Sequence, residues 1–199
     1  MVNQTYSPYA STMRYIVSLA LTLVLAATLG TAAPQAYRLD TARSSVGFTY
    51  AIDGSTAQGS MPVKSADVAL DLDNLPQSRV HVTLDAASAR AGFIIATQAM
   101  KDAKVLNTRR FPEITFRSTT ITGNLSGATV TGDLTVRGVT RPVTLTAGLY
   151  RQRGTDPRDR RNLLVLLTGE ISRAAFGATG YAKMVDDTIG LRIFARITR

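Results

Sequence analysis

Apolar and polar residues alternate on both sides of a turn within residues 132–145, GDLTVRGVTRPVTL. Leu134 and Val136 fall on one face, and the same alternation returns after the reversal. This pattern predicts a β-hairpin with one buried face. Gly138 is expected to supply the positive φ of a tight turn, and Pro142 to open the returning strand, where a missing N–H costs least.

The same two-residue period recurs along most of the chain after residue 36. It predicts strands at 37–53, 55–63, 68–72, 80–84, 114–118, 129–136, 143–147, 163–167 and 189–197. The Asp53-Gly54 pair between the first two strands is a strong hairpin signal. Eight or nine strands with no repeat of solenoid length indicate an all-β fold in one domain, and they suit a single closed antiparallel β-barrel.

Residues 90–106 change to a helical period. Ile95, Ala99, Met100 and Leu106 fall near the spacing of one helix face, which predicts one main helix. The strand expected at 163–167 differs from the others because all five of its residues are apolar. Both of its faces are therefore expected to be covered, one by the lumen and the other by the helix or by a second subunit in a homodimer.

The N-terminal stretch has the pattern of an export signal. Residues 1–36 contain no acidic residue and one basic residue, Arg14, which precedes an apolar run over 16–29; the small residues Gly-Thr-Ala-Ala follow at 30–33. We expect residues 1–33 to form a signal peptide helix, with Met13 as an alternative start, and residues 34–199 to form the barrel domain. The run is shorter than the roughly 20 apolar residues that span a bilayer, which favours cleavage over anchoring. The mature protein is then periplasmic or secreted, and it should begin within a few residues of Pro34.

The mature chain is basic and lacks cysteine. Removing the signal leaves 22 basic and 14 acidic residues, a net charge of +8. The excess serves solubility or favours anionic partners such as phospholipid headgroups, and the arginine-rich segment 151–161 is the candidate for peripheral contact with an anionic membrane surface. Basic residues without interleaved aromatics argue against nucleic acid. Without disulfides, burial and hydrogen bonds must hold the barrel together.

Catalytic constellations are scarce, so an enzyme is not expected. His81, the single histidine, lies on the polar face of its strand and has no clustered partners for a zinc site or a catalytic triad. Asp186 and Asp187 form an acid pair, a cation site or, more simply, the turn before the last strand, since adjacent strand residues point to opposite faces.

Three segments resemble the YceI-like family. Residues 132–145 match its G-x-L-T-[IV]-x-G-V-T-[KR]-P-V-T-L signature, and FPEITFRST at 111–119 and ISRAAFG at 171–177 match at the expected order and distance. Weaker matches lie at 39–48 and 85–88. The resemblance implies a lipocalin-like barrel that holds a long isoprenoid chain in its lumen. The family's helical region begins with a histidine and ends with two aromatics, whereas this chain has Gln-Ala-Met at 98–100 and Val-Leu at 105–106. A more aliphatic mouth is therefore expected.

The candidate ligand-binding residues are the inward positions of these segments. They are Val46, Phe48, Val82, Leu84, Met100, Phe116, Leu134, Arg173, Phe176 and Ile193. Arg173 is expected either to pair with a headgroup phosphate or to bond loop carbonyls, and Phe176 either to line the lumen or to plug the barrel end. Residue sizes leave open whether a small barrel is filled or holds one ligand.

These features support three hypotheses of different classes. The first is an exported binding protein that carries or sequesters an isoprenoid, an isoprenoid quinone or a similar long lipid, with no catalytic residue, metal or fixed cofactor. The second is an envelope stress or interaction protein whose barrel is filled. The third is an enzyme that acts on a lipid pyrophosphate.

Overall fold

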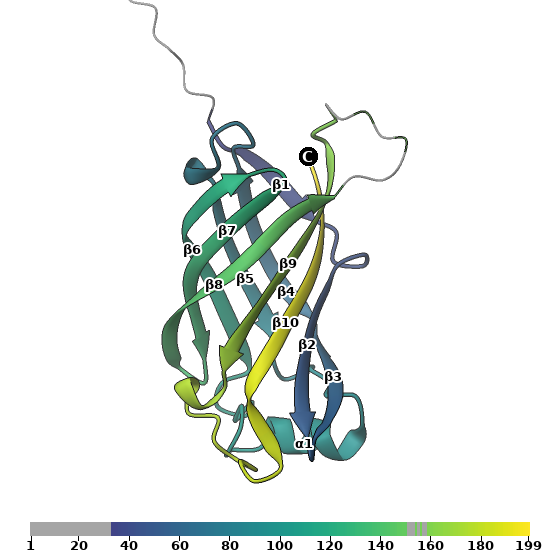
Figure 1. Cartoon of the computed structure of the whole chain (residues 1–199), viewed down its shortest axis with the longest axis vertical. Coiled ribbons are helices and arrows are strands. Elements are labelled where there is room, and N and C mark those ends of the chain that lie inside the picture. Colours follow the sequence, from purple (N-terminus) through teal and green to yellow (C-terminus); the bar gives the residue numbers. More distant parts are fainter. Residues whose placement is uncertain (1–32, 151–153, 155, 157–158) are drawn as a thin grey trace, which may run out of the picture. The chain divides into compact units, whose positions relative to one another are not determined.

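Antiparallel pairing joins ten strands into one sheet in the computed structural model, which describes residues 33–150, 154, 156 and 159–199 (Figure 1). The predicted signal peptide lies outside this range except for residue 33, as does much of the segment 151–161. In chain order the elements are β1 (Gln35–Leu39), β2 (Ser45–Ile52), β3 (Ser55–Met61), β4 (Val63–Leu70), η1 (Leu75–Gln77), β5 (Arg79–Asp85), α1 (Ile94–Lys101), β6 (Glu113–Asn124), β7 (Gly127–Val136), β8 (Val139–Tyr150), β9 (Asn162–Ser172), η2 (Ala174–Phe176) and β10 (Val185–Thr198).

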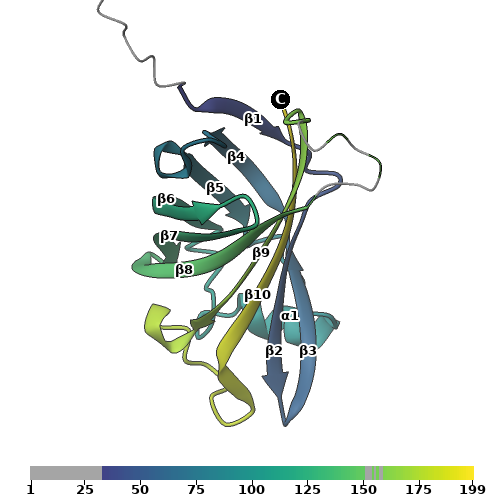
Figure 2. The same cartoon turned by 45° about the horizontal axis from the view of Figure 1, so that its top comes forward.

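Eight of these strands close a ring in the order β1-β4-β5-β6-β7-β8-β9-β10, because β1 pairs with both β4 and β10. The β2–β3 hairpin is attached to the remaining part of β10: β1 pairs with the C-terminal end of β10, and β2 with its N-terminal part. Figure 2 shows the hairpin extending from the ring on the side where α1 lies. The predicted closed antiparallel barrel with one main helix is confirmed.

The first predicted strand is not continuous, which corrects the expectation for residues 37–53. A turn separates β1 from β2, since the Asp40 carbonyl and carboxylate both accept hydrogen bonds from the backbone N–H of Arg43, at 3.2 and 3.1 Å. The next break falls at Pro62, between β3 and β4. The chain therefore changes pairing partner at each break: β1 pairs with β4 and β10 but β2 with β10 and β3, and β3 pairs with β2 but β4 with β1 and β5.

Two tight turns follow the expected residue chemistry. Asp53 and Gly54 have φ of 46° and 76°, and Arg137 and Gly138 have φ of 53° and 75°, so each pair forms a two-residue turn with both central φ angles positive. The expectation for Pro142 is wrong, because β8 begins at Val139 and the proline lies inside it. Its nitrogen faces away from β7, on a flank of β8 where pairing with β9 begins only at Thr146.

The helix is shorter than the predicted 90–106. Gly92 has a φ of 82°, and the Thr97 hydroxyl accepts a hydrogen bond from Ala91 N–H at 2.9 Å, so the chain enters the helix through a turn. At the other end Asp102 has a ψ of 158°, which ends the helix, and the residues up to Leu106 form turns. Among the described residues no helix combines the length and hydrophobicity that crossing a bilayer requires.

The outer face of β9 and the start of β10 also differ from expectation. Figure 1 places α1 at one end of the barrel, and Leu164 and Leu166 of β9 remain half-exposed on the outer face, so the helix does not cover this strand.

Asp186 and Asp187 do not form a turn before the last strand. They lie inside β10, where its register with β2 shifts between Val185 and Ile189.

Buried side chains from opposite walls form the core inside the barrel. One cluster near α1 and η2 contains Met61, Leu134, Val136 and Phe176. Two others, built around Leu163 and around Leu145, lie against half-buried residues from neighbouring strands. The core is thus divided into three clusters along the inside of the barrel wall.

Candidate functional site

The lumen contains a cavity of about 510 Å³. Every strand contributes to its lining, since the inward positions of each alternate with outward ones. The volume lies within the roughly 300–1,000 Å³ range of small-molecule sites. The barrel therefore encloses space for a ligand.

The cavity lining is almost wholly apolar. Its polar side chains are Ser44, Asn124 and Arg173, with the hydroxyls of Tyr50 and Tyr181. The Tyr50 hydroxyl donates a hydrogen bond of 2.7 Å to the Ala91 carbonyl, and burial raises the pKa of Tyr50 above its ordinary value. A molecule in this space would be held mainly by burial of apolar surface, at about 25 cal/mol per Å².

Two glycines explain why the lumen is open despite two inward phenylalanines. Phe48 is paired with Gly59 across β2 and β3, and a methyl group at position 59 would collide with the Phe48 ring. Similarly, a Cβ atom at Gly132 would lie 2.5 Å from Cζ of Phe116. Both rings therefore occupy the space beside a glycine at the barrel wall, and the central space remains free.

All ten predicted ligand-binding residues border the cavity: Val46, Phe48, Val82, Leu84, Met100, Phe116, Leu134, Arg173, Phe176 and Ile193. Val82, Phe116 and Leu134 are neighbours in register across β5, β6 and β7. Val46 and Ile193 pair on β2 and β10, and β10 is opposite β6 in the ring. The predicted set thus spans two facing walls, while its role in binding stays a prediction.

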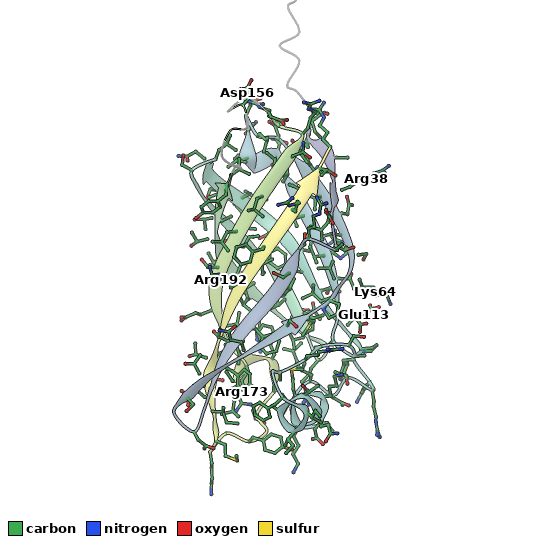
Figure 3. The ribbon with its side chains drawn as sticks, turned by 90° about the vertical axis from the view of Figure 1, so that its right-hand side faces the viewer. Arg38, Lys64, Glu113, Asp156, Arg173 and Arg192 are labelled. Carbon is green, nitrogen blue, oxygen red and sulfur yellow. The ribbon has the colours of Figure 1, made fainter. Side chains whose placement is uncertain are left out.

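The guanidinium group of Arg173 is bonded to loop carbonyls and is therefore not available to bind a headgroup phosphate. Its Nε donates to the Asp186 carbonyl at 2.9 Å, Nη2 to Val185 at 2.8 Å, and Nη1 to Gly180 at 2.7 Å and also to Ala178. The side chain is buried, and Figure 3 shows it at one end of the barrel. These contacts favour the loop-bonding alternative, because four of the five guanidinium N–H groups already have carbonyl acceptors.

Phe176 lies three residues further, at the end of η2. Its side chain is 2% exposed and packs with Met61, Leu134 and Val136. The neighbouring Asp187 carboxylate accepts a hydrogen bond of 2.8 Å from Ala174 N–H, and hydrogen bonds from the Ser172 side chain and from Ala174 lower the pKa of Asp187. The ISRAAFG segment is therefore a structural closure of this end of the barrel.

Sequence reasoning missed part of the cavity's boundary at the α1 end. Phe93, Ile95, Tyr181 and Met184 border the cavity and are also exposed to solvent. These residues lie before or inside the helix or in the loop that precedes β10, where no two-residue period marks an inward face. The run Phe93-Ile94-Ile95 could have indicated this part of the boundary, because three consecutive large apolar residues do not fit the single apolar stripe of an ordinary surface helix.

The other predicted polar features lie outside the lumen. His81 lies on the outer face of β5, paired with Asp67 and Arg117. In the described part of the segment 151–161, Arg160 makes two hydrogen bonds of 2.6 and 2.7 Å to Asp73, and Arg161 pairs with Asp159 at 3.4 Å. The described residues contain no group of three or more His, Cys, Asp or Glu side chains placed to hold a metal ion.

Comparison with known proteins gives the family. The family profile described as a YceI-like domain matches residues 37–197. The chain belongs to the YceI-like family. Protein YceI from Escherichia coli O17:K52:H18 and from Salmonella arizonae are each 34% identical to it over 119 residues, 60% of this chain and 56% of the relative. The aligned region thus spans little more than half the length of these relatives.

Solved structures of other proteins share the barrel. BcnA of Burkholderia cenocepacia superposes with a TM-score of 0.70 at 21% identity, over 81% of this chain and 99% of BcnA. A domain of Saccharophagus degradans described as polyisoprenoid binding superposes with a TM-score of 0.62 at 13% identity, over 82% of this chain and 98% of that domain. At these identities the comparison establishes the fold alone, a closed barrel.

Proposed function

We propose that this YceI-like protein binds one long apolar molecule, an isoprenoid or a lipid of similar chain, inside its barrel and carries or sequesters it. The observation that carries the proposal is the open apolar cavity of about 510 Å³. The Saccharophagus degradans domain, described as polyisoprenoid binding, supports the choice of ligand class. An isoprenoid quinone would fit the same class of site.

The two alternative hypotheses have less support. A filled barrel is at odds with the free space that Gly59 and Gly132 leave by seating the phenylalanine rings against the wall. For the enzyme, the lining of the lumen among the described residues contains no aspartate, glutamate, histidine, lysine or cysteine, so the hydroxyls of Tyr50 and Tyr181 are the only general acid–base candidates there. We therefore propose binding without catalysis.

Export is the second part of the proposal. It is supported by the signal pattern of residues 1–33, and the mature barrel would then lie in the periplasm or outside the cell. N-terminal sequencing of protein from the native envelope or medium tests it.

A homodimer is also proposed, through the half-exposed outer face of β9 at Leu164 and Leu166.

The binding proposal is tested by titrating delipidated protein with a fluorescent polyprenyl probe. We expect saturable binding of one probe per chain, and displacement of the probe by an unlabelled polyprenol. Absence of saturable binding, or uptake of many probes per chain, would show that the cavity does not act as a defined site.

A further inference from the structure

Large apolar side chains are exposed chiefly at one end of the barrel. Of the six with high exposure among the described residues, five belong to two segments: Phe93 directly precedes α1, Ile94 and Ile95 begin it, and Tyr181 and Met184 lie in the loop before β10. Their exposures, in this order, are 49, 76, 76, 45 and 47%. We call these five residues the rim. The sixth, Tyr150, ends β8 at the other end of the barrel, as Figure 1 shows. Large apolar side chains left exposed together at one end of a protein indicate an interaction surface.

The rim is continuous with the lumen. Four of its five residues border the cavity, and only Ile94 lies outside it. Main-chain hydrogen bonds fix the surrounding segments: Asp53 N–H donates to the Met184 carbonyl at 2.8 Å, and Gly180 N–H to the Lys104 carbonyl at 2.9 Å. An apolar path therefore runs from the cavity to the exposed end of the molecule.

Cations accompany the rim. Arg90, Lys101, Lys104 and Lys183 flank it in the chain, and none of them belongs to the four ion pairs found among the described residues. The acidic residues adjoining these segments are Asp53, at the β2–β3 turn, Asp102, whose carboxylate accepts a hydrogen bond of 2.9 Å from Lys104 N–H, and Asp186 and Asp187, just after Met184. Further cations lie there as well: Arg109 and Arg110 follow in the same turns, and Arg137 donates to the Ala103 and Val105 carbonyls. The local balance is positive.

We propose that the rim docks on a lipid bilayer that carries anionic headgroups, and that the lipid ligand passes between bilayer and lumen through it. Exposed isoleucine and phenylalanine beside lysine is the combination that places a helix in a membrane interface. A second copy fits less well, since a two-fold contact would bring the same cations face to face. Docking stands by itself, whereas ligand passage rests on the proposed function.

Co-sedimentation with phosphatidylglycerol–phosphatidylcholine vesicles tests the docking. Ile94→Glu should lower the partition coefficient by roughly tenfold or more, because Ile94 would lose its burial in the interface. The matched control is Tyr150→Gln, which removes an exposed large residue at the other end and should leave vesicle binding unchanged. Since Ile94 does not border the cavity, Ile94→Glu should still bind the polyprenyl probe in solution.

The charge component is tested separately. Lys101→Gln, Lys104→Gln and Lys183→Gln should each weaken binding to these vesicles by about fivefold at low salt, and less at high salt. Arg160→Gln with Arg161→Gln is the comparison, because both arginines already pair with acids in the described structure. The proposal is overturned if Ile94→Glu binds vesicles like wild type, if only the Arg160 and Arg161 changes reduce binding, or if Ile94→Glu merely converts a dimer into a monomer. If wild-type protein binds the vesicles but does not bind the polyprenyl probe, the proposed function is contradicted and the docking proposal stands.

Discussion

Replacing Val82 with tryptophan should abolish ligand binding while leaving the protein folded. Val82 projects from β5 into the cavity beside Phe116, its partner in register on β6. An indole there has free space in which to stand, so it occupies the volume that the ligand needs. We expect affinity for the polyprenyl probe to fall by at least about a hundredfold and the melting temperature to change little.

A control on the same strand separates blocking from misfolding. Thr83 follows Val82, lies on the outer face of β5 and does not border the cavity, so Thr83→Trp should retain probe binding. In a packed core, by contrast, Val82→Trp would destabilise the fold by about 1–3 kcal/mol. Marked destabilisation by Val82→Trp, in a protein whose wild type binds no probe, would contradict the open lumen.

Replacing Arg173 with methionine should cost more stability than any surface change near it. The substitution removes the donors that satisfy the carbonyls of Ala178, Gly180, Val185 and Asp186. Each buried acceptor left without a partner costs on the order of 1–3 kcal/mol, although water can reach some of them. We therefore expect a loss of about 2–4 kcal/mol in the free energy of unfolding, measured by urea denaturation.

Two further variants define what the arginine does. Arg141 is exposed and makes one long hydrogen bond of 3.4 Å to the Ala175 carbonyl, so Arg141→Met should change the free energy of unfolding by less than about 0.5 kcal/mol. Arg173→Lys should recover only part of the stability, because one ammonium cannot reproduce the planar fork. If Arg173→Met keeps wild-type stability but loses probe binding, the guanidinium serves the ligand and not the loop.

Local patterns predicted the antiparallel strands, whereas the lipocalin-like barrel was implied by the resemblance to the YceI-like family. The Asp53-Gly54 and Arg137-Gly138 turns are encoded by adjacent residues, and the two-residue period identifies inward faces strand by strand. Strand boundaries depended on contacts between residues far apart in the sequence. The division of residues 37–53 into β1 and β2 depends on β10, where Asp40 N–H donates to the Arg196 carbonyl at 2.8 Å.

The candidate site was predicted in part for the same reason. Val46, Val82 and Ile193 border the cavity because alternation fixes the face on which a strand residue lies. Whether the lumen is open could not be predicted, because it depends on the register that seats Phe48 against Gly59. The rim was missed because the loop positions Tyr181 and Met184 follow no period.

The central claim, that the lumen holds one long apolar molecule, is tested most directly by extracting lipids from protein purified under native conditions. Mass spectrometry of the extract should show a polyprenyl or similar long-chain species in about a one-to-one ratio to the chain, and Val82→Trp protein purified in the same way should lack it. If wild-type and Val82→Trp protein both yield only trace, non-stoichiometric lipid, the proposed binding function is wrong.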